Sequence, residues 1–237
     1  MEAGTPQYAV QMKQICKYFG SFCALDHVDL NVRKGTIHAL LGENGAGKST
    51  LMNILYGFYR ADEGEILLNG EPVEVKNPSV AIKHGIGMVH QHFMLVENFT
   101  VTQNIMLGAE TTKGFDVLDL ESVKAQIREL SERYGLYVDP DAKIQDVSVG
   151  MQQRVEILKA LYRGVDILIL DEPTAVLTPQ EIEELIEIMH RLVGDGKTVI
   201  IITHKLREIK QSSDYCTIIR RGHYVDTVSV AEESEED

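Results

Sequence analysis

The first third of the chain has an alternating pattern of hydrophobic and polar residues that predicts β-strands. Residues 28–33 alternate one by one, which is the period of a strand with one buried face. Residues 36–41 are more continuously apolar, and glycines follow them at once. Residues 66–75 predict a hairpin that turns at an Asn-Gly pair, and residues 86–90 predict another short buried strand. This part of the chain is therefore expected to be rich in β-structure.

The middle of the chain changes to a helical period. Residues 120–134 place apolar side chains three or four positions apart, and shorter helical patterns occupy residues 101–108 and a segment that begins near Gly150. Beyond residue 164 strands and helices alternate. The elements predicted there are a strand at 165–170, a helix at 179–193, a strand at 198–203 and a hairpin at 215–228 that turns at Arg221-Gly222. These patterns predict one α/β core with an all-helical insertion between its two halves.

The predicted helix at 179–193 is specified by its own residues. Thr178 suits the N-cap, Pro179 suits the first turn, and Glu181 completes a capping box. The apolar face consists of Ile182, Leu185, Ile186, Met189 and Leu192. We interpret this stripe as core and assign no function to it.

A candidate phosphate site follows the apolar strand at 36–41. Residues 42–49, GENGAGKS, fit the pattern G-x-x-x-x-G-K-[ST], and a helical segment comes next, which is the context of a P-loop. Glycines let backbone N–H groups turn toward phosphate oxygens, and the helix N-terminus adds partial positive charge. Lys48 is expected to reach the β- and γ-phosphates, and Ser49 to place its hydroxyl on Mg²⁺. The alternative is a glycine-rich turn with an incidental lysine.

A second, acidic element is needed to hold the metal ion. Residues 165–173, VDILILDEP, predict a buried strand that ends in Asp171 and Glu172. A carboxylate at the carboxyl end of a parallel strand points into the crevice where nucleotides bind. We expect Asp171 to act on Mg²⁺, directly or through water, and Glu172 to polarise the attacking water as a general base. The alternative is a strand end capped by two solvated acids.

Composition and charge limit the kinds of partner. The 237 residues include 23 Lys and Arg against 36 Asp and Glu, a net charge of −13, and five of the acids lie in the last seven residues. Such an acidic chain argues against broad binding of a nucleic acid backbone, which relies on clustered Lys and Arg. No apolar run approaches the ~20 residues that span a bilayer, so other polypeptides would have to do any spanning. The acidic tail is expected to be solvated and disordered.

The cysteines and histidines predict no metal site. Cys16, Cys23 and Cys216 lack a metal-binding spacing such as C-x-x-C, and an odd number without a signal peptide favours reduced thiols in the cytosol. His90 and His92 are expected to share one face of a strand, but the sequence offers no Cys/His cluster beside them. They are interpreted as ordinary strand histidines.

Several separated motifs resemble those of ATP-binding cassette (ABC) ATPases. The segment VSVGMQQRVEI at 147–157 is similar to the signature of that family, His204 matches its switch histidine, and Gln91 matches its Q-loop glutamine. Phe19 matches the aromatic residue that stacks on adenine, with neighbouring Tyr18 as a competing candidate. The resemblance implies an α/β fold, namely a P-loop NTPase core of the ABC type with an N-terminal antiparallel β subdomain and an inserted all-helical subdomain.

This resemblance also implies domain boundaries, cofactors and site residues. A single nucleotide-binding domain is expected over residues 1–237, with its core at about 8–92 and 164–228, the helical subdomain at about 93–163 and the acidic tail at 229–237. The implied cofactors are ATP and Mg²⁺. The residues expected to act in hydrolysis are Glu172, His204 and Gln91, and those expected at Mg²⁺ are Ser49, Gln91 and Asp171. The residues expected to bind the nucleotide are Phe19, Gly42, Glu43, Asn44, Gly45, Ala46, Gly47, Lys48, Ser49, Thr50, Ser148 and Gly150.

A narrower likeness indicates an importer. The segments VHQHFMLV, ENFTVTQNI and DEPTAVLTPQE resemble the ATP-binding subunits of bacterial nucleoside and simple-sugar importers. Those subunits usually carry two cassettes, so this chain is expected to be a fragment that holds the first one. The implied partners are a second cassette, transmembrane permease subunits and, indirectly, an extracytoplasmic substrate-binding protein, with no nucleic acid. The implied location is the cytoplasmic face of the membrane. Two cassettes would sandwich two ATPs, with Ser148 and Gly150 serving a γ-phosphate held by the other cassette.

The sequence departs from the family pattern in two segments, and it leaves two other functions open. Val149 and Met151 replace a glycine and a glutamine of the signature, and Thr178 stands where the family commonly has an aspartate. One rival is a soluble cassette ATPase acting on ribosomes or DNA, which would be expected to carry basic patches. The other is a regulatory ATP-binding module without turnover, against which the presence of Glu172 and His204 argues.

Overall fold

Six strands form the central sheet of the structure, a computed structural model that describes residues 7–109, 112–113 and 117–232. Their order across the sheet is β12 (His223–Ser229), β11 (Tyr215–Arg220), β3 (Ile37–Leu41), β10 (Thr198–Thr203), β9 (Ile167–Asp171) and β6 (Ile86–Val89). The strands from β11 to β6 run parallel, and β12 is antiparallel to β11. Because parallel strands end at one edge, Leu41, Asp171 and Thr203 come together there.

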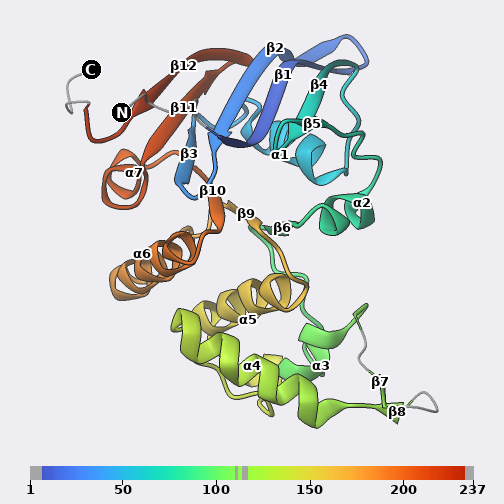
Figure 1. Ribbon diagram of the computed structural model, residues 1–237. Helices are drawn as coiled ribbons and strands as arrows, with labels where there is room; N and C mark the ends of the chain where they lie inside the picture. The colour runs from blue at the N-terminus through green and yellow to red at the C-terminus, as the bar shows by residue number, and fades with distance from the viewer. Residues whose placement is uncertain (1–6, 110–111, 114–116, 233–237) are drawn as a thin grey trace, which may run out of the picture.

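A second, antiparallel sheet covers the helix that follows the phosphate loop. Its order is β2 (Phe22–Arg33), β1 (Tyr8–Phe19), β4 (Glu63–Leu68) and β5 (Glu71–Pro72), and it lies at the top of Figure 1. One buried hydrophobic cluster joins this sheet, α1 (Lys48–Tyr56) and one face of the central sheet, and it includes Met12, Leu51 and Ile169. The N-terminal antiparallel β subdomain predicted from the resemblance is thus present.

The insertion forms a helical group at the opposite end of the molecule (Figure 1). It contains α3 (Val101–Met106), α4 (Leu120–Tyr134) and α5 (Val149–Tyr162), and α5 also packs against β6. A second buried cluster links these helices to α6 (Pro179–Gly194) and to the other face of the central sheet. The insertion is not all-helical, because β7 (Thr112–Lys113) and β8 (Val117–Leu118) pair within it. Strands of two residues show no period that a sequence pattern could display.

The local predictions for turns and caps are confirmed. The β4–β5 hairpin turns at Asn69-Gly70 and the β11–β12 hairpin at Arg221-Gly222, with positive φ at all four residues. Before α6, the Thr178 Oγ1 accepts a hydrogen bond from the Glu181 backbone N–H at 3.3 Å. The Glu181 carboxylate accepts one from the Thr178 N–H at 2.9 Å, which completes the capping box.

Other predictions at this level missed or misplaced elements. Two short helices, α2 (Pro78–Lys83) and α7 (Leu206–Ser212), were not expected, since one or two turns carry too little period to be recognised. The strand at 86–90 ends at Val89, so the prediction that His90 and His92 share a strand face is wrong. The acidic tail falls mostly on residues 233–237, which lie outside the described part of the chain.

A buried histidine in the central sheet makes the fold sensitive to acid. The His38 side chain is fully buried, and its Nε2 lies 2.8 Å from Thr217 Oγ1, while its Nδ1 has no partner. Burial, assisted by the positive charge of Arg33, lowers the pKa of His38 to about 4. The unfolded chain, in which a histidine has a pKa of about 6.5, therefore binds more protons than the folded chain between those values.

The free energy of unfolding is thus expected to fall as the pH drops from about 6.5 to 4, by up to about 3 kcal/mol from His38 alone. His38→Asn removes the titration, so the variant should lose less stability over this interval than the wild type, whatever its stability at neutral pH. Urea unfolding at several pH values measures the difference between the two curves. Parallel curves would contradict the assignment.

Candidate functional site

The phosphate loop connects β3 to α1 and closes around a buried lysine. Gly47 precedes the helix with φ 107°, and a Cβ at this position would lie 2.7 Å from the Leu25 side chain. Both facts require glycine. The Lys48 amine is buried and donates hydrogen bonds to the carbonyl oxygens of Gly42 at 2.5 Å and Glu43 at 2.9 Å. These two hydrogen bonds hold the Lys48 amine inside the loop.

Asp171 lies opposite the first turn of α1. Its Oδ1 accepts a hydrogen bond from the Ser49 hydroxyl at 3.4 Å. Burial, assisted by the negative charge of Glu172, raises the pKa of Asp171, and burial lowers the pKa of Lys48. Both shifts disfavour the charged forms, so a cation beside Asp171 and an anion beside Lys48 would restore them. The hydroxyl and the carboxylate are hard oxygen donors, which fit Mg²⁺.

Glu172 and His204 meet at the ends of neighbouring strands. Glu172 follows β9 and His204 follows β10, and Glu172 Oε1 lies 3.3 Å from His204 Nδ1. The Glu172 backbone has φ 44°, a left-handed conformation that is uncommon for a residue with a side chain. Its N–H donates to the Ile202 carbonyl at 3.0 Å, which ties this turn to β10. The sheet thus holds the acid and the imidazole in a fixed relation.

An open cavity of about 460 Å³ unites most of these groups. Its lining residues are Phe19, Phe22, Ala24, Asn44, Gly45, Ala46, Gly47, Lys48, Ser49, Thr50, Gln91 and Glu172. Phe19 lines it while the competing Tyr18 does not. Asp171 adjoins it through Ser49, and His204 adjoins it through Glu172.

Four predicted nucleotide-binding residues do not line this cavity, namely Gly42 and Glu43 at the start of the phosphate loop and Ser148 and Gly150 at the start of α5. Ser148 caps α5, and its hydroxyl accepts a hydrogen bond from the Met151 N–H at 3.2 Å. Gly150 faces α6, where an added Cβ would overlap the Glu181 carboxylate. The predicted site residues therefore form two separate groups, one around the cavity and one at the start of α5.

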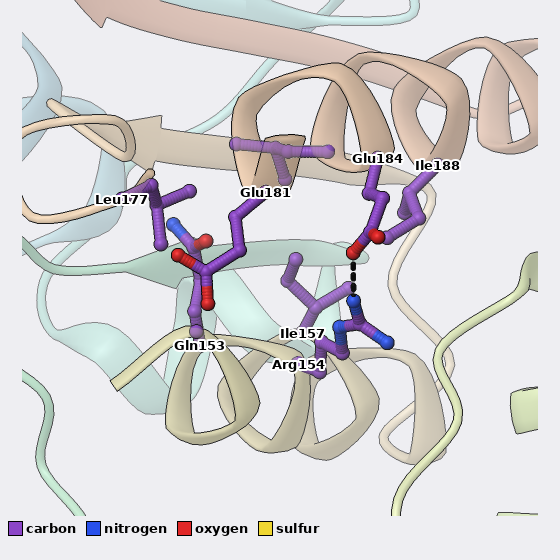
Figure 2. A pocket seen from close by; sticks show the side chains of 9 residues that line it. Gln153, Arg154, Ile157, Leu177, Glu181, Glu184 and Ile188 are labelled. Carbon is purple, nitrogen blue, oxygen red and sulfur yellow. Dashed lines mark hydrogen bonds and ion pairs between the residues drawn. The ribbon is translucent and has the colours of Figure 1, made fainter. Parts of the chain in front are cut away.

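Side chains between α5 and α6 tie the start of α5 to the acidic strand end. Figure 2 shows Arg154 on α5 paired with Glu184 on α6, and Gln153 of α5 on the side of Glu181 and Leu177. The Gln153 amide donates to the carbonyl of Pro173, the residue after Glu172, at 2.7 Å. A free volume of only about 10 Å³ remains between the two helices, so this contact is packed rather than hollow.

Sequence reasoning missed several residues that shape the site. Phe22 and Ala24 line the cavity from the β1–β2 hairpin, although no motif marks them. The buried Glu208 carboxylate accepts hydrogen bonds from Thr174 Oγ1 at 2.7 Å and Thr203 Oγ1 at 3.2 Å. It thereby links the segment after Glu172 to the segment before His204. The spacing of residues along the sequence does not predict a hydrogen bond between such distant segments.

The segment after β6 is held by the insertion. The buried Glu156 of α5 accepts a hydrogen bond from the Met94 N–H at 2.8 Å, three residues after Gln91. His90 packs its ring against Tyr56 and Phe58, with centroids 6.0 and 5.4 Å away, and burial lowers its pKa. Gln91 is therefore placed between a packed histidine and an anchored loop.

The fold and the site define a class. The P-loop connects a strand of the parallel sheet to a helix, and the acidic end of another strand faces it. This arrangement is typical of P-loop nucleotide-binding proteins. The sequence model of the family described as ABC transporter matches residues 25–175. The chain belongs to the ABC transporter family. Among the described residues no helix is long and apolar enough to cross a membrane.

Comparisons with individual proteins agree with this family assignment. The chain is 60% identical over 228 residues to the nucleoside import ATP-binding protein NupA of Lactococcus lactis subsp. cremoris, covering 96% of this chain and 45% of that protein. It is 54% identical to the guanosine import ATP-binding protein NupO of Bacillus subtilis, covering 98% and 45%. The chain thus spans about half the length of these curated relatives. A solved ATP-binding cassette of an ABC transporter in its ADP conformation superimposes with a TM-score of 0.84 at 28% identity, covering 95% of this chain and 92% of that one.

Proposed function

We propose that the chain binds and hydrolyses ATP to power the uptake of nucleosides or related simple sugars through a partner membrane permease. The names of the two relatives above, a nucleoside import and a guanosine import ATP-binding protein, support the transported class. The proposed place of work is the cytoplasmic face of the membrane, at the permease. The whole chain, residues 1–237, would act as one nucleotide-binding domain.

In this proposal ATP occupies the cavity with its base on the Phe19 side. Phe19 is 44% exposed and stands at the cavity wall, where a planar base could stack on it. The loop from Gly42 to Thr50 would surround the phosphates, with the Lys48 amine released from its two carbonyl partners toward them. Ser49, Asp171 and Gln91 would hold Mg²⁺, whose charge would neutralise the phosphate oxygens.

The contact of 3.3 Å between Glu172 and His204 carries the assignment of hydrolysis. Glu172 lines the cavity and is oriented by His204, so its carboxylate can accept a proton from a water molecule bound near the terminal phosphate. His204 would keep the carboxylate turned toward that water. Phosphate release by the full-length protein reconstituted with its permease, stimulated by a nucleoside on the outside, tests the function. Hydrolysis that no transported solute alters would favour a soluble cassette ATPase.

The same proposal needs a second cassette. Ser148 and Gly150 do not line the cavity of their own chain, so they would complete a cavity on the partner cassette. A substrate-binding protein would take part only through the permease. We expect the isolated chain to be monomeric, with a weak dimer formed only in the presence of ATP and a low basal hydrolysis rate. Sedimentation velocity with and without ATP measures this, and a tight dimer without nucleotide would contradict it.

Ser148→Asp sharpens the dimer test. Aspartate caps a helix as well as serine does, so α5 should remain intact, but its charge would repel a phosphate held by the partner. The ATP-dependent dimer should disappear. Ser79→Asp, in the first turn of α2 and exposed, adds the same charge elsewhere and should leave the dimer unchanged.

A further inference from the structure

Three potential metal ligands converge at one place on the antiparallel sheet, outside the nucleotide cavity. Cys16 lies on β1, and Asp26 and His27 lie on β2. A sulfur, a carboxylate oxygen and a ring nitrogen from these residues all lie within 4.8 Å of one another. His27 Nδ1 is 2.6 Å from Asp26 Oδ1, and the His27 backbone N–H donates to Cys16 Sγ at 3.3 Å.

A β-bulge produces this convergence. β1 and β2 pair Ile15 with Val28 but Lys17 with Leu25, so that Asp26 and His27 both stand opposite Cys16. His27 takes φ 48°, a left-handed conformation that histidine adopts only occasionally. The Asp26 N–H donates to the Gly222 carbonyl at 2.8 Å, which fixes the bulge against the β11–β12 turn. The regular pairing of β1 with β2 is interrupted here, and the interruption brings the three side chains together.

The three groups form a set that suits one kind of ion. We propose that Cys16, Asp26 and His27 bind Zn²⁺ or a similar thiophilic divalent cation, with a fourth position open to water. Thiolate, imidazole and carboxylate are the three protein ligands of zinc. All three cysteines of the chain are free, and the proposed nucleotide site uses none of the three ligands.

The distances are compatible with coordination after a small adjustment. Zinc ligands lie about 2.0–2.3 Å from the ion, so ligand atoms in a tetrahedral site are roughly 3.3–3.6 Å apart. The hydrogen-bonded pair at 2.6 Å must open to admit the ion. The Asp26 and His27 side chains are 40% and 56% exposed, so they can turn, while the buried Cys16 stays fixed. The ion would enter from the solvent side.

A nearby histidine adds support from outside the set. His223 Nδ1 lies 3.7 Å from Asp26 Oδ2, and His223 is the first residue of β12, next to Gly222. Histidine contacting a ligating carboxylate is the kind of outer partner that orients metal ligands. Gly222 in turn donates its N–H to the Ala46 carbonyl of the phosphate loop, at 2.9 Å. The bound ion would therefore brace the hairpin that carries Phe22 against the turn beneath the phosphate loop.

Cobalt(II) is the probe, because cobalt bound to a thiolate gives a charge-transfer band in the near ultraviolet. The full 237-residue chain, titrated with Co²⁺ without nucleotide, should show this band at one ion per chain, and Zn²⁺ should displace it. Even outer partners of a metal contribute about 10- to 100-fold in affinity, so Cys16→Ser should lower the affinity for Zn²⁺ at least ~100-fold and abolish the band. His223→Gln should lower the affinity by about 10- to 100-fold and keep the band.

Two further variants separate the site from its surroundings. Cys23→Ser removes an exposed thiol of the same hairpin, whose Sγ donates to the Leu25 carbonyl, and it should leave the band and the affinity unchanged. His27→Asn removes the imidazole while keeping a residue that tolerates positive φ, so it should bind Zn²⁺ weakly even if Cys16→Ser fails to fold. Zn²⁺ should raise the Tm of the wild type and not that of His27→Asn. A missing band, a band that survives Cys16→Ser, or a band lost in Cys23→Ser would overturn the proposal.

Discussion

Glu172→Gln is expected to slow ATP hydrolysis by about 10²- to 10⁴-fold while leaving ATP binding intact, because the substitution removes the proposed general base and little else. Glutamine keeps the size of the side chain and can still contact His204, and it sits in the same left-handed backbone as glutamate. ATP should bind equally well or more tightly, since carboxylate–phosphate repulsion is relieved. Closed dimers should accumulate with ATP. Single-turnover hydrolysis and ATP titration measure both effects.

Two comparisons make this result specific. Glu183→Gln, on the exposed face of α6, removes a charge away from the cavity and should hydrolyse like the wild type. Asp171→Asn should weaken Mg²⁺-dependent binding as well as turnover, because Asp171 is paired with Ser49 rather than with His204. Wild-type turnover in Glu172→Gln would remove Glu172 from the mechanism. A wild type that never hydrolyses ATP beside its second cassette would favour the regulatory module.

Lys48→Ala is expected to weaken the binding of Mg-ATP by about 2–5 kcal/mol, roughly 30-fold to several thousand-fold. Lys48 is the buried cation of the phosphate loop, and truncation leaves the phosphate charge without its partner. The fold should persist, because the loop conformation also rests on Gly47 and on the backbone of α1. Calorimetry with Mg-ATP measures the affinity, and circular dichroism checks the fold.

The matched control for this change is Lys83→Ala, an exposed lysine in the last turn of α2. It removes one positive charge from an already acidic chain without touching the cavity. Its affinity for Mg-ATP should equal that of the wild type. If Lys48→Ala folds and binds ATP as tightly as this control, residues 42–49 are not the phosphate site.

The local signals in the sequence predicted the local structure well. The capping box at Thr178 and Glu181 and the turns at Asn69-Gly70 and Arg221-Gly222 depend on neighbouring residues, so the sequence around them contains the whole reason for their shape. Elements without such signals were missed, such as β7 and β8, whose two residues carry no period. The predicted strand stops before His90, because the last pairing of β6 is that of Val89 with Leu170, and the His90 ring packs against Tyr56 and Phe58, far away in sequence.

In the candidate site too, the residues of local motifs were predicted and the contacts between distant segments were not. The P-loop pattern and the acidic strand end located Lys48 and Asp171, because the residue types and spacing within each short motif already indicate which group it binds. Pairings between distant segments, such as Glu208 with Thr174, could not be foreseen from spacing. The proposed metal ligands are another case. Cys16 and His27 are eleven positions apart and match no metal motif, and only the bulge between β1 and β2 brings them together.

The position of α5 has a consequence for how the insertion can vary. The chain leaves the central sheet after β6 and returns in its parallel neighbour β9, and α5 is the last helix before that return. β6, α5 and β9 therefore make a complete crossover by themselves, while α3, α4 and the β7–β8 pair are spliced into the connection ahead of α5. Every strand pairing of the central sheet lies outside that spliced segment. The order and register of the central sheet therefore do not depend on the length of that segment, whereas α5 has to span the distance from one strand to the next.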